Sequence, residues 1–130
     1  MKTTLTPGNM TVAATYFDFD AALDRCCGDT DFLAEMVDLL QTTVATRRIA
    51  LRAAVDRGDP EAIAEVAHAL KGAVGSMTTG VPYTVTRELE LLGMSGESAG
   101  ADTLLNTLEI SLDQLLHETR SWSTRRDAAT

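Results

Sequence analysis

The chain has 130 residues, a hydrophobic fraction of 45%, and a formal net charge of −8 from 11 basic and 19 acidic residues. This length and composition suit one globular domain with a core of its own. The acidic balance argues against binding to nucleic acid or to anionic membranes, and no apolar run reaches the roughly 18 residues that span a bilayer.

The chain begins with a segment that has no helical pattern, followed by a short predicted helix. Residues 1–14 lack a signal-peptide core, so we expect a flexible tail and a cytoplasmic protein. Asp20 can cap a short helix that ends near Cys27. The inner side of this helix would carry Leu23 and Cys26. Adjacent cysteines do not readily form a disulfide, so we expect two free thiols, at least one of them in the core.

A long second helix is predicted between Asp29 and Gly58. Asp29 is a good N-cap, and Gly58 can adopt the left-handed conformation that ends many helices. Apolar residues recur along one stripe of this helix: Leu33, Val37, Leu40, Val44, Leu51 and Val55. Arg47 and Arg48 interrupt the stripe, and we expect their aliphatic stems to lie along the edge of a bundle.

The third helix has the strongest opening signal in the chain. Asp59 is a good N-cap, and Pro60 suits the first helical position. We expect this helix to reach about Thr78 and to stop before Gly80. Its apolar stripe has no gap and consists of Ile63, Val66, Ala67, Leu70, Val74 and Met77.

Two further helices complete the pattern. Pro82 can open a fourth helix that ends within residues 93–96, and a small-residue loop over 95–100 leads into a fifth. The inner stripe of the fifth helix consists of Leu105, Leu108, Leu112, Leu115, Thr119 and Trp122. We expect residues 123–130 to form a flexible tail. Short loops and weak strand signals predict an all-α fold over 15–122: a monomeric antiparallel four-helix bundle with an additional short N-terminal helix.

One histidine of the third helix is predicted to face solvent. At about 100° per residue, His68 projects roughly 150° from the centre of the apolar stripe. Ala64 lies one turn before it, and Gly72 and Gly75 lie one and two turns after it. A glycine inside a helix costs about 1 kcal/mol relative to alanine, and an exposed face gains no structure from it. We therefore interpret this face as cleared for a partner, with Lys71 able to approach a group on the ring.

The run AHALKGAVGS, residues 67–76, resembles the signature of histidine phosphotransfer (Hpt) domains of multistep phosphorelays. Their pattern is His, any residue, Leu, Lys, Gly, often followed by small residues. The resemblance extends over Phe17–His117, and its specific part is the motif around His68. The Leu89–Glu90 pair falls at a typical distance after the histidine. Thr78 and Pro82 depart from the family pattern at the turn between the third and fourth helices.

The resemblance implies a role for each residue of the motif. His68 would be the phosphoacceptor through Nε2, Lys71 would stabilise the phosphoryl oxygens, and Gly72 would leave access to the ring. The partners would be response-regulator receiver domains and a hybrid sensor histidine kinase. The receiver would supply an aspartate and Mg²⁺, and this chain would need no cofactor. Because the sequence has no nucleotide-binding loop, we expect a phosphocarrier and not an enzyme.

The docking surface is expected to surround His68. Its rim would include Ala64, Glu65 and Gly75, and Glu65 would either orient Nδ1 of the ring or face water. The part on the second helix would consist of Leu39, Val44, Arg47 and Arg48.

Two other classes of function stay open at this point. The chain could be an Hpt-like docking or inhibitory module that is never phosphorylated. It could also be a bundle enzyme with a buried metal or cofactor, which predicts inward polar ligands that the apolar stripes largely lack. His117 is opposite the stripe of the fifth helix and has no glycine neighbours, so we interpret it as a surface histidine.

Overall fold

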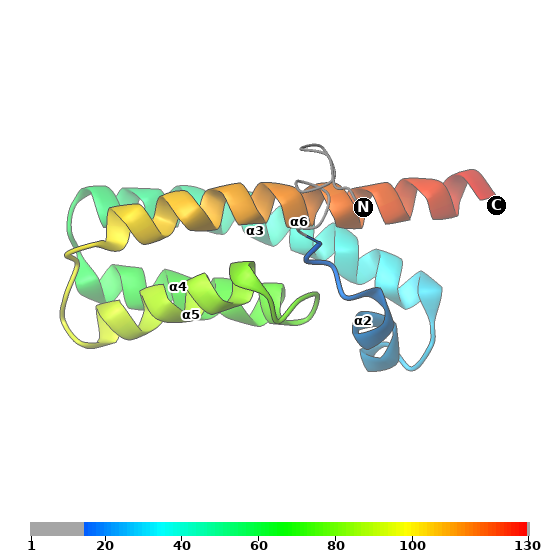
Figure 1. Ribbon diagram of the computed structural model, residues 1–130, viewed down its shortest axis with the longest axis horizontal. Helices are drawn as coiled ribbons and strands as arrows, with labels where there is room; N and C mark the ends of the chain where they lie inside the picture. The colour runs from blue at the N-terminus through cyan, green and yellow to red at the C-terminus, as the bar shows by residue number, and fades with distance from the viewer. Residues whose placement is uncertain (1–14, 130) are drawn as a thin grey trace, which may run out of the picture.

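The computed structural model of the protein describes residues 15–129, which fold into five helices joined by short turns. They are α2 (Phe19–Arg25), α3 (Thr30–Asp56), α4 (Pro60–Gly75), α5 (Val81–Met94) and α6 (Ala101–Ala129). Helices α3 to α6 form an antiparallel bundle in which each packs on the next, and α6 returns to pack on α3 (Figure 1). The predicted all-α fold is confirmed: it is a four-helix bundle with a short additional helix, α2, at one end.

Aspartate side chains fix the starts of three helices. Asp29 accepts hydrogen bonds from two backbone N–H groups in the first turn of α3, and Asp59 accepts one in α4, where Pro60 is the first helical residue. Both caps were predicted. The prediction for α2 was wrong by two residues, because Asp18 provides the cap and Asp20 lies inside the first turn. An acidic side chain there still favours the helix dipole.

The turns between the helices depend on a few local interactions. Gly58 ends α3 with φ of 61°, the predicted left-handed conformation. Helix α4 ends at Gly75, three residues before the predicted Thr78. Thr78 is buried in the turn instead, where its hydroxyl accepts a hydrogen bond from the N–H of Gly80. Pro82 is buried in the first turn of α5. The two departures from the family pattern thus build a compact α4–α5 connection.

Helix α6 is longer than the sequence predicts. It continues past Trp122 to Ala129, so residues 123–129, which we expected to be a flexible tail, are helical. Two contacts support this extension: Arg126 pairs with Asp31 of α3, and Trp122 packs with Phe17 in an aromatic cluster. The predicted N-terminal tail, residues 1–14, lies outside the described residues.

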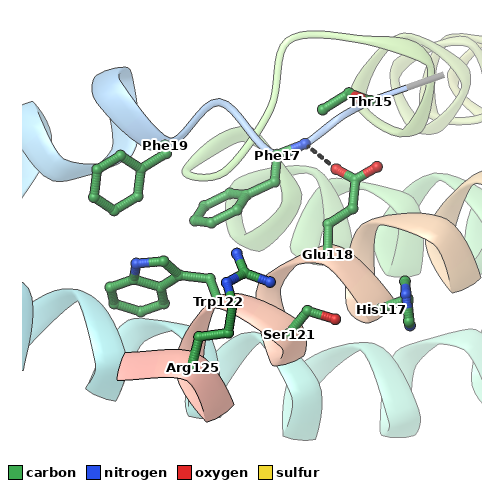
Figure 2. A pocket seen from close by; sticks show the side chains of 8 residues that line it. All are labelled: Thr15, Phe17, Phe19, His117, Glu118, Ser121, Trp122 and Arg125. Carbon is green, nitrogen blue, oxygen red and sulfur yellow. Dashed lines mark hydrogen bonds between the residues drawn. The ribbon is translucent and has the colours of Figure 1, made fainter. Parts of the chain in front are cut away.

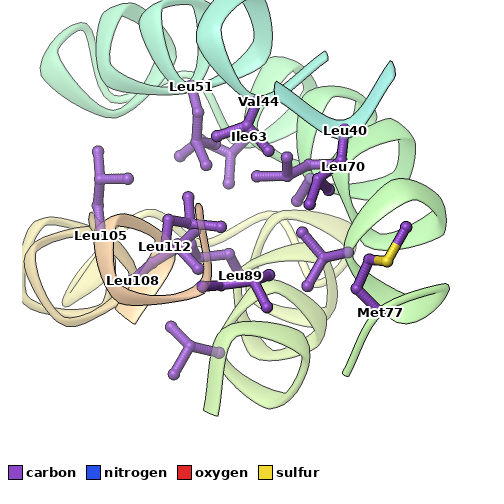
Figure 3. Packing of buried hydrophobic residues seen from close by; sticks show 14 of the residues in the cluster. Leu40, Val44, Leu51, Ile63, Leu70, Met77, Leu89, Leu105, Leu108 and Leu112 are labelled. Carbon is purple, nitrogen blue, oxygen red and sulfur yellow. The ribbon is translucent and has the colours of Figure 1, made fainter. Parts of the chain in front are cut away.

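The core is the space between the apolar stripes of the four long helices. Figure 3 shows leucine, isoleucine and valine side chains from α3, α4, α5 and α6 meeting there. Cys26 is buried at its edge and Cys27 is exposed, and both are free thiols, as predicted. Burial raises the pKa of the Cys26 thiol above its ordinary value. Within residues 15–129, no helix combines the length and the apolar character needed to cross a membrane.

Candidate functional site

His68 lies on the outer surface of α4, where the helical periodicity predicted it. Its side chain is 72% exposed, while Ala67 and Leu70 on the same helix are fully buried. The imidazole is therefore not packed among the aliphatic side chains of the core. A macromolecular partner can reach it directly.

A buried carboxylate on α5, that of Glu90, holds the side chains of His68 and Lys71 on α4. Oε2 of Glu90 lies 2.6 Å from Nδ1 of His68, and Oε1 lies 2.6 Å from Nζ of Lys71. The Glu90 side chain is only 10% exposed, and the Lys71 side chain is 27% exposed. Each carboxylate oxygen therefore has its own partner, as a buried acid requires.

This arrangement favours the ionised form of Glu90 and determines which nitrogen of the neutral His68 ring carries the proton. The hydrogen bond from Lys71, and secondarily that from His68, lowers the pKa of Glu90 below its ordinary value, against the opposing effect of burial. The ionised carboxylate can only accept, so Nδ1 of His68 is the nitrogen that carries the proton. Nε2 makes no hydrogen bond within residues 15–129. In the neutral ring, Nε2 is the nitrogen with a free lone pair.

The two glycines after His68 have different surroundings. A Cβ at Gly72 would meet no atom within 4 Å apart from the backbone of its own helix, so the space beside this position is open. A Cβ at Gly75 would lie 3.0 Å from the ring of Tyr83 on α5. Our expectation that this face gains no structure from its glycines is therefore wrong for Gly75. That glycine lets an aromatic ring pack against α4.

Ala64, one turn before His68, lies where the backbones of α4 and α5 come close together. A Cβ on Gly93 of α5 would fall 2.7 Å from the backbone nitrogen of Ala64 and 2.5 Å from the carbonyl oxygen of Pro60. The two backbones are in contact because neither residue carries a long side chain there. This contact brings Glu90, less than one turn from Gly93, within hydrogen-bonding distance of the His68 ring.

The comparison with known protein families agrees with this geometry. The family model of the Hpt domain matches residues 32–121, which contain α4, α5 and all three residues of the His68 site. The chain belongs to the Hpt domain family. Histidine phosphotransfer is the function associated with Hpt domains.

A solved structure has the same fold as this Hpt domain. It is the crystal structure of histidine-containing phosphotransfer protein B from Pseudomonas aeruginosa PAO1, which matches with a TM-score of 0.78 and 22% sequence identity. The match covers 86% of this chain and 97% of that one. Among curated proteins, none is similar enough in sequence to be recognised as a relative.

The predicted docking residues of the Hpt domain do not all lie on its surface. Leu39 of α3 is 57% exposed, and Arg47 is exposed as well. Val44 is fully buried in the core, so its assignment to the docking surface was wrong. The apolar stripe of α3 had already placed Val44 inward. Glu65 is exposed and has no hydrogen bond to His68, so of the two alternatives it faces water.

From the sequence, Glu90 was noted only as part of the family pattern and was assigned no role in the site. The prediction searched the helix of His68 for a group that orients Nδ1, but the group comes from α5. A usable signal was present, because a short connection makes consecutive helices antiparallel neighbours. In such a pair, His68 lies beside the residue of α5 that is equally far from the turn, and Glu90 is at about that distance. An acidic residue on the buried side of a helix is also unusual, which marks Glu90 as a candidate.

A hollow in the Hpt domain lies away from His68, beside the C-terminal half of α6. Figure 2 shows Phe17 and Phe19 facing Trp122 there, with Glu118 at one side. Glu118 accepts hydrogen bonds from the backbone N–H groups of Tyr16 and Phe17. The hollow therefore lies where the segment that precedes α2 is anchored to α6. His117 is exposed at its rim, which agrees with its interpretation as a surface histidine.

Proposed function

We propose that this protein carries a phosphoryl group on Nε2 of His68 and exchanges it with the aspartate of receiver domains in a two-component phosphorelay. One observation carries the proposal: His68 is exposed, yet its Nδ1 is held by a buried carboxylate. This arrangement aims one unprotonated nitrogen at solvent and fixes the orientation of the ring. A nucleophile that must be reached by a second protein needs both properties.

The transfer balances without any further co-reactant. The lone pair of Nε2 attacks the phosphorus of a receiver aspartyl phosphate, an N–P bond forms, and the P–O bond to the aspartate breaks. The aspartate leaves as a carboxylate, and the ring keeps its proton on Nδ1 and becomes cationic. Glu90 then lies directly beside that positive charge and stabilises it. The reverse reaction restores the neutral ring.

Lys71 neutralises Glu90 in the resting site and can serve the phosphoryl group as well. Its ammonium has three N–H donors, and the bond to Glu90 uses one of them. The remaining donors can reach an oxygen of a phosphoryl group on His68, one turn away on the same face of α4. The ammonium group of Lys71 would thus contact both the carboxylate of Glu90 and the phosphoryl group.

We propose that the partner supplies the rest of the chemistry. Phosphoryl transfer needs in-line geometry and charge neutralisation on the equatorial oxygens. We assign the acceptor aspartate and a bound Mg²⁺ to the receiver, and the ATP-dependent step to a hybrid sensor histidine kinase in the same cytoplasmic relay. The receiver would dock over Gly72, where space is open, and would touch the exposed residues Leu39 and Arg47 of α3.

Transfer of label from a phosphorylated receiver tests this proposal. The protein is incubated with a receiver domain that carries radiolabelled phosphate, and the protein band is then treated with acid or base. We expect an acid-labile, base-stable adduct on wild type and none on His68→Gln. Unlabelled wild type would instead favour a docking or inhibitory module, and label that persists on His68→Gln would place the phosphate elsewhere.

A further inference from the structure

One arginine near the site has no polar partner in the described part of the chain. Arg87 is exposed on α5, less than one turn before Glu90, and it makes no hydrogen bond or ion pair within residues 15–129. Two arginines of α3 are engaged instead: Arg48 pairs with Asp113, and Arg52 pairs with Asp102 and Glu109 of α6. In a protein with an excess of acidic residues, a cation that remains unpaired is available for an anionic ligand.

Contacts across the α4–α5 pair place Arg87 beside the site. Tyr83 packs on Gly75, and Glu90 hydrogen-bonds to His68. Arg87 follows Tyr83 by four residues and precedes Glu90 by three, so all three lie on the same face of α5. Because α4 and α5 are antiparallel, a residue between Tyr83 and Glu90 on α5 lies level with a residue between Gly75 and His68 on α4. Arg87 is therefore level with Lys71 and Gly72.

This position lies next to the imidazole. His68 precedes Lys71 by three residues, about 4.5 Å along the helix axis. A Cβ on Gly72 would meet nothing within 4 Å, so the space beside this position is open. The long, flexible stem of an arginine can cross that space.

The charge of the site supplies the reason for a second cation. Lys71 already forms an ion pair with Glu90, in which Nζ and Oε1 are 2.6 Å apart. A phosphoryl group on Nε2 brings about two negative charges, while Glu90 remains ionised beside the ring. Lys71 and the cationic ring together do not neutralise both anions. The guanidinium of Arg87, at the same level as Lys71, supplies the additional positive charge. Its two parallel N–H donors also match two phosphoryl oxygens.

We infer that Arg87 is a phosphoryl-binding residue of this site and contacts the oxygens of phosphorylated His68 from α5, opposite Lys71 on α4. This inference rests on the proposed function, since it needs a phosphoryl group on His68. It adds to that function a second cation, from a different helix. Arg87 would stabilise both the transferring phosphoryl group and the finished phosphohistidine.

A small phosphodonor tests the inference without a partner protein. Phosphoramidate transfers its phosphoryl group to imidazole: Nε2 forms a bond to phosphorus, the P–N bond of the donor breaks, and ammonia leaves. Wild type, Arg87→Ala, Arg87→Lys and Arg125→Ala are each treated with phosphoramidate. The rate of labelling and the titration of the phosphoryl group by ³¹P NMR are measured. Arg125 is a matched control, because it is an exposed arginine of α6 with no ion pair within residues 15–129.

We expect Arg87→Ala to be labelled about tenfold more slowly than wild type, the size of effect that a lost charge-assisted hydrogen bond produces. Its phosphoryl group should titrate at higher pH than that of wild type, and Arg87→Lys should recover part of both effects. Arg125→Ala should match wild type. Arg87→Ala with a wild-type rate and an unchanged phosphoryl titration would overturn the inference.

The same experiment separates this inference from the proposed function. Wild type that takes up no label, or a His68→Gln variant that takes up as much as wild type, would reject phosphorylation of His68 and the role of Arg87 with it. Normal labelling of wild type, absent on His68→Gln and insensitive to Arg87→Ala, would reject only the role of Arg87. Circular dichroism on each variant confirms that the helices are intact.

Discussion

Oε2 of Glu90 lies 2.6 Å from Nδ1 of His68 and thereby ties an exposed imidazole on α4 to a buried carboxylate on α5. The acid stays ionised because Lys71 lowers its pKa by hydrogen bonding to the other oxygen. Under the proposed function, it would present a negative charge to the ring both before and after phosphorylation. An amide at this place would provide the hydrogen bond but not the charge.

Replacing that charge should shorten the life of the phosphohistidine. In Glu90→Gln the amide oxygen can still accept from Nδ1–H, but the cationic ring loses its counter-ion. A charge-assisted hydrogen bond is stronger than a neutral one by about 1 kcal/mol, so we expect about fivefold faster loss of label from His68. The measurement is the decay of radiolabelled phosphoprotein in buffer. Equal half-lives for Glu90→Gln and wild type would show that the charge is unimportant.

Glu90 should also make folding stability depend on pH. Its pKa is lowered in the folded protein from an ordinary value of 4.5, so the folded state binds this proton less readily than the unfolded chain does. The stabilising contribution is fully present above that ordinary value and is lost as the pH falls through the lower folded-state pKa. Urea denaturation at pH 7 and about pH 3.5 should show a larger acid-induced loss for wild type than for Glu90→Gln. Parallel losses in the two proteins would contradict this expectation.

Gly72 should matter for transfer and not for folding. No atom outside its helix lies within 4 Å of the position that a Cβ would take there. Glutamine is a better helix former than glycine by up to about 1 kcal/mol, so Gly72→Gln should leave the fold as stable or slightly more so. Transfer from a receiver should nevertheless slow strongly, because the new side chain fills the approach to His68. Gly72→Ala is the matched control and should transfer at close to the wild-type rate. A destabilised Gly72→Gln protein with normal transfer would refute the access argument.

Gly93 should show the opposite behaviour. A Cβ there would lie 2.5 Å from the backbone oxygen of Pro60, which has no flexible end that can move aside. Gly93→Ala should therefore reduce the free energy of unfolding by about 1–3 kcal/mol, the usual range for overpacking. Urea denaturation measures this loss, with Gly72→Ala as the control that adds the same methyl group in open space. A Gly93→Ala protein as stable as wild type would mean that α4 and α5 can separate without cost.

Most of the fold was predictable from sequence because it depends on local signals. The caps at Asp29 and Asp59, the left-handed Gly58 and the apolar stripes each act within a few residues of their own position. The exposure of His68 followed from the same periodicity. Errors arose where tertiary contacts decide the outcome, as at the C-terminal end of α6, where Arg126 pairs with Asp31 of α3.

The candidate site was predicted only as far as one helix could show it. His68, Lys71 and Gly72 lie on α4, and their spacing is visible in the motif itself. Glu90 comes from α5, and its partnership with His68 depends on how the two helices are aligned. The packing role of Gly75 was missed for the same reason, because Tyr83 also belongs to α5.

The backbone contact at Gly93 and Ala64 has a consequence for how this protein can lose its activity. The distance between α4 and α5 decides whether the glutamate can touch the ring, and that distance is set by a missing side chain and not by any reacting atom. Under the proposed function, phosphotransfer would therefore fail because of a methyl group that never contacts the phosphoryl group. A variant of this kind would keep its histidine, lysine and glutamate, and a motif search would still find it intact.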